Sequence, residues 1–405
     1  MPEIPSARVV PRRASLDAVL DYAWGTGVFT AGDAMPAVGL TRSTTIDALD
    51  DLVGRGLLRE LPNARAVGDY SKGRPARRFE LRADGAVVVG LDAGRVHITA
   101  TVADLRGESL SREHIVRDEQ HLSADGRRAD VASAVDAALA AAGRRRQDVL
   151  ALCVGVPAPV DAEGVSPPHR EGFWRLTNPD LGEMFAAWAP LVRVENDASL
   201  AAVAEGSVGI ARGVANYVTL LAGERLGAGV VADGRLLRGA HGGIAEMVAF
   251  DHVRGVDGAW GLGYRAAQWA REGVASGAIG AQHPLAVAGV EHIDGRMVLE
   301  LAAAGDPDAS AIVERVGAML ARVAGVFGSL FDPELIVVSG AISAGIGGVL
   351  EAARHRLAAD LDLPAPRLAA SSLGADIVAR GAVAGAVDLA RAGALDLSLR
   401  RAAAG

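Results

Sequence analysis

An internal duplication limits the fold of this chain more than any other feature. Residues 91–106 match residues 220–235 at an offset of 129, each with an apolar run, a turn that contains glycine and a second apolar run. Each segment therefore reads as a strand, a turn and a returning strand. A chain that carries this unit twice is expected to form two similar lobes. Because the glycine turns expose backbone N–H groups, two turns that face each other could clamp a nucleotide.

The segments around the duplicated units alternate between strands and helices. Residues 149–154 and 192–194 read as buried strands. Apolar residues recur at helical spacing over residues 312–327, before a further strand at 335–338. Helices that alternate with strands predict an α/β body.

Length and composition limit the class of protein. The 405 residues suffice for roughly two to three domains. No stretch reaches the roughly 18 consecutive apolar residues of a membrane span, and the first 13 residues lack the apolar core of a secretion signal. We therefore expect a cytoplasmic protein without a membrane partner. The single cysteine, Cys153, excludes a disulfide within the chain and a zinc site made of cysteines.

The N-terminal part reads as a helix-turn-helix. Apolar residues at helical spacing predict one helix over residues 16–23 and another over 46–53. Between them, Thr30 and Asp33 have the spacing of a capping box, which predicts the start of a short helix. Gly39 ends that helix. A helix, a glycine turn and a second helix form the pattern of many DNA-binding proteins.

The start of the last helix is the candidate DNA-reading element. Thr41 is placed to cap it, and the first turn of such a helix enters the major groove. The residues expected to meet base edges or phosphates are Thr41, Arg42, Ser43 and Thr45. Arg42 is the best candidate for a bidentate contact with guanine.

Two short strands after these helices predict a wing. Residues 57–61 and 77–81 read as strands joined by a polar loop. The tip and the returning strand carry cations that suit the phosphate backbone or a narrow minor groove, namely Lys72, Arg74, Arg77 and Arg78. Two alternatives stay open: a solvated basic hairpin, and a small winged element that binds protein.

Charge is divided unevenly between this head and the rest of the chain. Residues 1–83 hold 12 Lys/Arg and 10 Asp/Glu, so they carry +2 of an overall −8 and leave −10 to the remainder. An acidic body is repelled by phosphate groups. DNA contact is therefore expected from the head alone.

Together these segments resemble the ROK family of bacterial repressors and sugar kinases, and the head with Gly73-Arg74-Pro75 resembles its regulator branch. The resemblance runs from about residue 14 to about residue 393. It implies an α/β fold with a winged helix-turn-helix at residues 1–83. A two-lobed, actin-like (ribonuclease-H-like) sugar-kinase body would follow, with its lobes at 84–200 and 201–405.

Five segments of the body carry this resemblance. The turn after Asp92 is similar to the first phosphate motif of the family, and residues 221–229 are similar to the second. Residues 155–161 resemble the loop of the sugar lobe. Residues 195–197 resemble the catalytic segment, and residues 242–250 the segment with a sugar-binding Glu.

Both phosphate motifs depart from the family pattern. Family kinases have Gly-Thr-Gly at the second turn, where this chain has Gly223-Glu224-Arg225. The first turn has lost a Gly-Thr pair and carries Arg95 and Val96 after Gly94. A carboxylate at Glu224 would face phosphate, and each such pair at about 4 Å costs roughly 1 kcal/mol in water and about 4 at an effective dielectric constant of 20. The remnants of these degenerate motifs are Asp92, Gly94, Gly223, Glu224 and Arg225.

Three polar residues of the family's sugar site are retained, namely Asn196, Asp197 and Glu246. The resemblance implies that their amide and carboxylate groups bind sugar hydroxyls. Asp197 resembles the general base of the kinases. Because phosphoryl transfer depends on positioning and neutralising the nucleotide, a base without a phosphate cradle is expected to serve binding instead of catalysis.

The family's structural zinc site is missing. The resemblance implies a His and three cysteines after the sugar-binding Glu, but Ala249 stands in place of the His and residues 253–266 contain no cysteine. A second sugar-contacting Glu is replaced by Ala266. No metal and no cofactor is expected.

The sequence as a whole predicts a DNA-binding transcriptional regulator of the repressor kind, located at the nucleoid when bound to DNA. Its partners would be a double-stranded DNA operator, a sugar-like effector between the lobes, and further copies in a homodimer or homotetramer. Two alternatives stay open: an ATP-dependent sugar kinase, which could be bifunctional, and a body that serves only as an oligomerisation scaffold.

Overall fold

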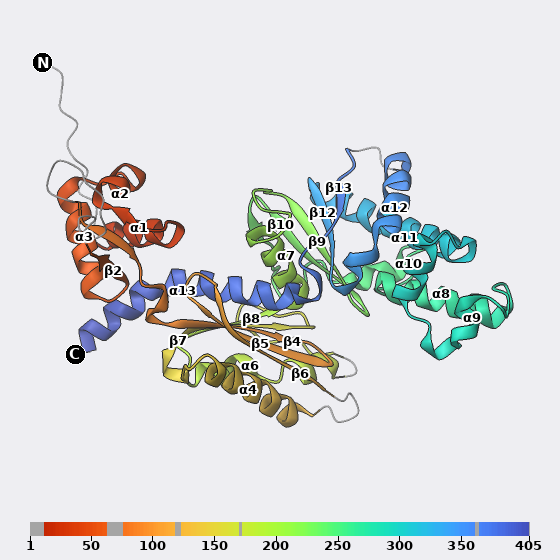
Figure 1. Ribbon diagram of the computed structural model, residues 1–405, viewed down its shortest axis with the longest axis horizontal. Helices are drawn as coiled ribbons and strands as arrows, with labels where there is room; N and C mark the ends of the chain where they lie inside the picture. The colour runs from red at the N-terminus through yellow and green to blue at the C-terminus, as the bar shows by residue number, and fades with distance from the viewer. Residues whose placement is uncertain (1–11, 63–75, 118–122, 170–171, 361–363, 405) are drawn as a thin grey trace, which may run out of the picture.

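The computed structural model describes residues 12–62, 76–117, 123–169, 172–360 and 364–404. Three parts follow one another along the long axis: a small head, a first lobe built on one sheet and a second lobe built on another (Figure 1). Within the described ranges, no helix is both long and apolar enough to cross a bilayer.

The head has the arrangement of a winged helix-turn-helix, as the sequence predicts. Its elements are α1 (Arg12–Gly25), β1 (Phe29–Thr30), α2 (Ala31–Val38), α3 (Arg42–Gly54), β2 (Leu58–Leu61) and β3 (Arg78–Leu81). The strands form an antiparallel sheet in the order β1-β3-β2. The capping box before α2 is formed, because the Thr30 N–H donates to the Asp33 carboxylate at 2.8 Å and the Asp33 N–H to the Thr30 hydroxyl at 3.3 Å. Gly39 ends α2 at φ 66°, a left-handed conformation that favours glycine.

The first lobe is a five-stranded sheet in the order β6-β5-β4-β7-β8. Its strands are β4 (Val87–Ala93), β5 (His97–Asp104), β6 (Ser109–Val116), β7 (Val149–Val156) and β8 (Leu191–Asn196). Its helices are α4 (Ala124–Ala141), α5 (Phe173–Thr177) and α6 (Leu181–Ala186). Apolar side chains of α4 and α6 share one buried core with the sheet.

The second lobe is a five-stranded sheet in the order β11-β10-β9-β12-β13. Its strands are β9 (Tyr217–Ala222), β10 (Leu226–Ala232), β11 (Arg235–Leu236), β12 (Leu335–Ser339) and β13 (Arg367–Ala370). Its helices are α8 (Leu262–Ser276), α9 (Pro284–Ala288), α10 (Gly295–Ala303), α11 (Pro307–Phe331) and α12 (Gly347–Asp360). The predicted amphipathic helix corresponds to α11, and the strand expected after it corresponds to β12.

The two sheets confirm the internal duplication. In the first, β4 pairs antiparallel with β5 and parallel with β7, and β7 pairs parallel with β8. In the second, β9 pairs antiparallel with β10 and parallel with β12, and β12 pairs parallel with β13. The same topology occurs twice, which gives the two-lobed α/β body that the sequence predicts.

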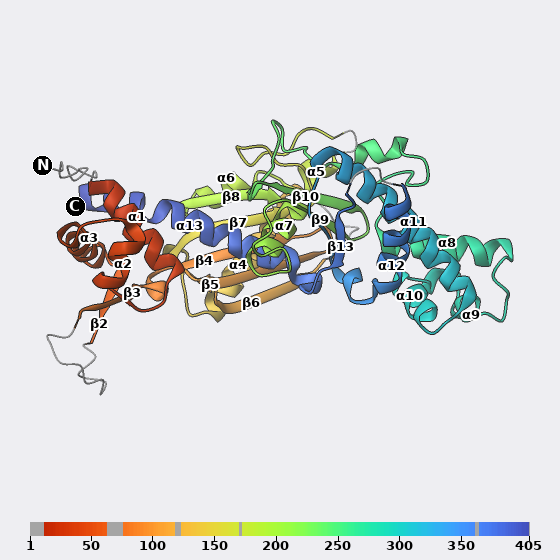
Figure 2. The same cartoon turned by 90° about the horizontal axis from the view of Figure 1, so that it is seen from above.

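The boundary expected at residues 200 and 201 needs correction. It divides α7 (Asp197–Ser207), and the C-terminal helix α13 (Ile377–Ala404) returns to the first lobe (Figures 1 and 2). A Cβ at Gly90 of β4 would lie 2.4 Å from the Val383 nitrogen, so strand and helix touch through their backbones. Because α13 has small residues on this face, it packs on the first sheet although it follows the second in sequence.

Candidate functional site

The exposed first turn of α3 is the candidate nucleic-acid interface. The Thr41 hydroxyl accepts a hydrogen bond from the Thr44 N–H at 3.3 Å and caps the helix. Thr41, Arg42 and Ser43 are exposed. Their contact with DNA stays a prediction, and their exposure is what that prediction requires.

The prediction that Thr45 contacts DNA is wrong. Its side chain is fully buried, and its hydroxyl donates to the Thr41 carbonyl oxygen at 2.9 Å. Residues three and four positions apart share one face of a helix, so Thr45 lies with the buried Ala48, Leu49 and Leu52. The helix turns this side chain toward the core of the head.

Arg77 holds the described part of the wing against the helices. Its guanidinium donates to both carboxylate oxygens of Glu60, at 2.9 and 2.7 Å, and lies 2.7 Å from the Asp50 carboxylate. These acidic partners, Glu60 first, raise the pKa of Arg77. Much of its positive charge is therefore compensated within the head.

The other predicted wing cations are placed differently. Arg78 is half-buried in β3. Lys72 and Arg74 lie outside the described residues.

The head is joined to the first lobe by Arg106, which follows β5. Its guanidinium donates to the carbonyl oxygens of Ala23, Trp24 and Thr26 at 3.4, 3.3 and 2.7 Å, and so satisfies the C-terminal end of α1. The Trp24 indole N–H donates to the Leu105 carbonyl oxygen at 3.1 Å. No sequence pattern indicated these contacts, since they join residues about 80 positions apart.

Two ion pairs extend this junction to α13. Arg391 donates to Asp21 of α1 at 2.6 Å, and Arg13 of α1 donates to Asp396 at 2.6 Å. The head therefore contacts both the first lobe and the C-terminal helix.

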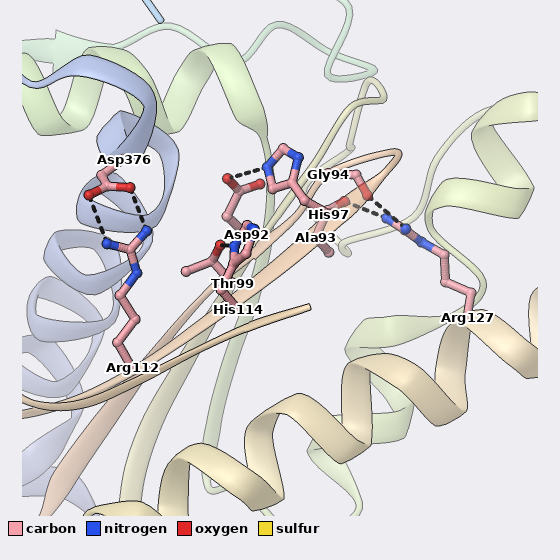
Figure 3. Close-up of polar contacts among 9 residues, drawn as sticks. All are labelled: Asp92, Ala93, Gly94, His97, Thr99, Arg112, His114, Arg127 and Asp376. Atoms are coloured by element: carbon pink, nitrogen blue, oxygen red, sulfur yellow. Dashed lines mark hydrogen bonds and ion pairs between the residues drawn. The ribbon is translucent and has the colours of Figure 1, made fainter. Parts of the chain in front are cut away.

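The first glycine turn opens into the space between the lobes and is filled by a histidine. Asp92, at the end of β4, is buried, and its carboxylate lies 3.0 Å from Nε2 of His97 (Figure 3). A Cβ at Gly94 would come within 2.5 Å of the same imidazole ring. The hydrogen bond to Asp92 raises the pKa of His97. The imidazole thus covers the turn that the resemblance assigns to phosphate.

A buried arginine stabilises this turn by hydrogen bonds to its backbone carbonyl oxygens. The Arg127 guanidinium donates to the carbonyl oxygen of Gly94 at 2.8 Å and to that of Ala93 (Figure 3). It also donates to the Thr177 carbonyl oxygen at 3.0 Å. Burial lowers the pKa of Arg127 to about 10. Sequence reasoning missed this residue, because an arginine within α4 reads as a surface residue.

The two glycine turns meet through an ion pair between the lobes. Arg95 of the first turn and Glu224 of the second approach to 3.1 Å. They are 129 residues apart, so they occupy equivalent positions in the duplicated units. The pair joins the lobes where the resemblance would place the phosphates of a nucleotide.

A neighbouring segment covers the second turn. The Gly261 N–H donates to the Glu224 carbonyl oxygen, and the Leu226 N–H to that of Ala259, both at 2.9 Å. A Cβ at Gly261 would lie 1.9 Å from the Gly223 carbonyl oxygen, so only glycine fits there. The close approach fixes the backbone of the second turn at Gly223 and Glu224.

The loop that would carry zinc in the family is held by other means. The Arg265 guanidinium donates to the carbonyl oxygens of Val256 and Asp257 at 2.9 and 2.6 Å. The Trp260 and Tyr264 rings stack, with 4.6 Å between their centroids. In the described part of the chain, no group of three His, Cys, Asp or Glu side chains is placed to hold a metal ion. The residues present do not fit zinc.

The cleft between the lobes is defined here by the acids Asp92, Asp197 and Glu246, of which α7 contributes Asp197. Asn196 caps this helix, accepting from the Ser199 N–H at 3.0 Å, and its amide donates to the Ala158 carbonyl oxygen at 3.2 Å. The Asp197 carboxylate accepts from the Ala198 N–H at 2.8 Å. Burial raises the pKa of Asp197 to about 7, and the carboxylates of Asp92 and Glu246 add to this shift. Asn196 has a structural role, whereas Asp197 faces other acids.

Glu246 reaches the same cleft from the second lobe. Gly242, at φ 69°, packs on the backbone of Val160, and a Cβ there would lie 1.9 Å from the Val160 carbonyl oxygen. Burial raises the pKa of Glu246, and the Arg225 guanidinium partly offsets this. The structure therefore brings Asp92 and Glu246 close enough to Asp197 to interact with it electrostatically. Such acceptors suit the hydroxyls of a sugar and repel phosphate.

Comparisons with known proteins agree with this architecture. Residues 88–392 match the model of the ROK family. The bifunctional enzyme NanE/NanK of Brucella suis is 35% identical over 228 residues, which are 54% of this chain and 40% of that protein. The chain thus matches less than half the length of this relative.

Two further comparisons include regulators. The DNA-binding transcriptional repressor Mlc of Escherichia coli is 24% identical over 309 residues, 71% of this chain and 73% of that protein. A crystal structure of a ROK family transcriptional regulator, described as a homologue of the E. coli Mlc protein, superposes with a TM-score of 0.76. It is 23% identical, and the match covers 96% of this chain and 99% of that one.

Proposed function

This chain belongs to the ROK family, and from that premise we propose that it is a DNA-binding transcriptional regulator, of the repressor kind, controlled by a sugar or sugar derivative. The effector would bind between the lobes. The single observation that carries this proposal is the Arg95–Glu224 ion pair, at 3.1 Å, on a chain that also has a winged head.

The ion pair and the histidine argue against a nucleotide at the glycine turns. A phosphate near Glu224 would meet its carboxylate, at a cost of about 1 kcal/mol per charge pair in a solvated site. At the other turn, the His97 imidazole already hydrogen-bonds with the Asp92 carboxylate and covers Gly94. Both turns are engaged by side chains of the chain itself.

The retained acids support a neutral polyhydroxyl ligand. Asp197 and Glu246 offer carboxylate acceptors from opposite lobes, so one ligand could bind both lobes and draw them together. Asn196 would contribute less, because its amide already has two partners.

The C-terminal helix α13 would connect closure of the lobes to the head. α13 begins beside the cleft, where Asp376 is paired with Arg112 of β6 (Figure 3), and it reaches α1 through Arg391. A change in how the lobes pack would therefore reach the head through one helix. In a homodimer or homotetramer this would alter the distance between two heads, and hence the fit to half-sites about 10 bp apart or a multiple of that.

A fluorescence anisotropy assay tests the proposal. DNA fragments from upstream of the protein's own gene and neighbouring genes are titrated at moderate salt, with and without a panel of sugars, sugar phosphates and amino sugars. We expect selective binding that Arg42→Ala weakens and that one panel member changes. Binding that is the same for all fragments and unaffected by Arg42→Ala would contradict it.

A second candidate, an ATP-dependent sugar kinase, is favoured by Asp197. A pKa of about 7 suits a general base at neutral pH. An ADP-release assay over the same sugar panel decides between the two functions. Turnover that Asp197→Asn abolishes would establish the kinase and exclude a purely regulatory body.

A further inference from the structure

A cavity of about 550 Å³ lies where the two lobes meet, apart from the cleft described above. Its wall comes from β8, α7, the second sheet and α13. The cleft acids Asp92, Asp197 and Glu246 do not line it. Its volume is in the range of small-molecule sites, about 300 to 1,000 Å³.

The lining of the cavity carries a surplus of positive charge. It contains three arginines, Arg193, Arg235 and Arg238. Glu195 is bonded to Arg238 at 2.7 Å, and the remaining carboxylate is that of Asp388. Because the Glu195–Arg238 pair is neutral, the lining is left with two arginines, Arg193 and Arg235, and one acid, Asp388.

Another part of the lining is apolar. It consists of Leu200 and Val203 of α7, Val214, and Leu236 of β11. Cys153 also contributes, and burial raises the pKa of its thiol to about 12, so it is uncharged. A lining that combines cationic and apolar side chains suits a ligand with one charged end and one carbon end.

We propose that this cavity is a second binding site, for a small organic oxyanion that joins a carboxylate or phosphate group to an apolar part. Guanidinium groups bind such oxyanions through charge-assisted, often bidentate hydrogen bonds. The apolar part would pack on the apolar side chains of the lining and be removed from water. This ligand differs in charge from the neutral effector proposed for the cleft.

The position of the site connects it to both functional regions. α7 begins at Asp197 and contributes Leu200 and Val203 to the cavity. α13 contributes Asp388, three residues before Arg391, which is paired with the head. An occupant would therefore contact the two helices that lead to the cleft and to the head. A ligand could bind at this second site whether or not the protein is a transcriptional regulator.

Calorimetric titration of the full chain tests the site with three probes of similar size: phenyl phosphate, benzoate and the neutral benzyl alcohol. We expect the two anions to bind at one site per chain and benzyl alcohol to bind far more weakly. Arg193→Gln and Arg235→Gln should each weaken anion binding about tenfold or more, because each removes a charge-assisted hydrogen bond. The control is Arg212→Gln, an exposed arginine near the cavity but outside its lining, and it should leave binding unchanged.

Several outcomes would overturn the proposal: no anion binding, equal binding of benzyl alcohol, or anion binding that neither Arg193→Gln nor Arg235→Gln weakens. Asp197→Asn separates this site from the cleft, since loss of phenyl phosphate binding in that variant would place the anion in the cleft. Circular dichroism checks folding. If Arg193→Gln fails to fold, the exposed Arg235→Gln decides the question.

Discussion

Replacing Glu224 by Gln removes a negative charge from the second glycine turn with little change in size. The Glu224 side chain is 57% exposed, so the value of about 1 kcal/mol per charge pair in water is the appropriate one. Loss of this one repulsion favours a bound nucleotide by about 1 kcal/mol, or roughly fivefold in affinity.

Calorimetric titration with ADP measures this gain. The matched control is Glu300→Gln, which removes an exposed carboxylate paired with Arg296 at 2.6 Å on α10. We expect the wild type and the control to bind ADP equally weakly and Glu224→Gln to bind it measurably more tightly. If Glu224→Gln and wild type have the same ADP affinity, or if the control gains as much, the carboxylate is not what disfavours a nucleotide.

Three further predictions concern the head and the cleft. Arg42→Ala should lower specific DNA affinity by roughly 1 to 3 kcal/mol, whereas Thr45→Val should leave it unchanged because Thr45 is buried, as anisotropy with specific and random DNA would reveal. Arg77→Ala should change the salt slope of DNA binding by less than the one unit of a full phosphate contact, since Glu60 already compensates its charge; a loss of one unit would count against this. Burial raises the pKa of Asp197 to about 7, well above its usual value. The stability that the protonated Asp197 contributes is therefore fully present below about pH 4 and is lost as pH rises through 7. In denaturation measured across this range, Asp197→Asn should remove this pH dependence, and an unchanged pH profile would refute the prediction.

Local patterns were sufficient to predict much of the fold. The Thr30–Asp33 capping box and Gly39 place α2 because these signals act within one helical turn. The repeat at an offset of 129 residues predicted two lobes, since a duplicated unit pairs its strands in the same way twice. The capping signals act between residues near one another in sequence, and the repeat can be recognised because each of its copies is a short local pattern.

The sequence by itself determined the helices and strands of the head, the duplicated sheets and the acids offered to the cleft. The tertiary structure decided that Thr45 points into the core, that α13 returns to the first lobe, and that Arg95 and Glu224 face each other. Caps and periodic apolar residues act over a few positions, so they can be recognised in the sequence. The direction of a side chain and the meeting of residues 129 positions apart depend on how whole elements pack, and packing is settled only when all of them are in place.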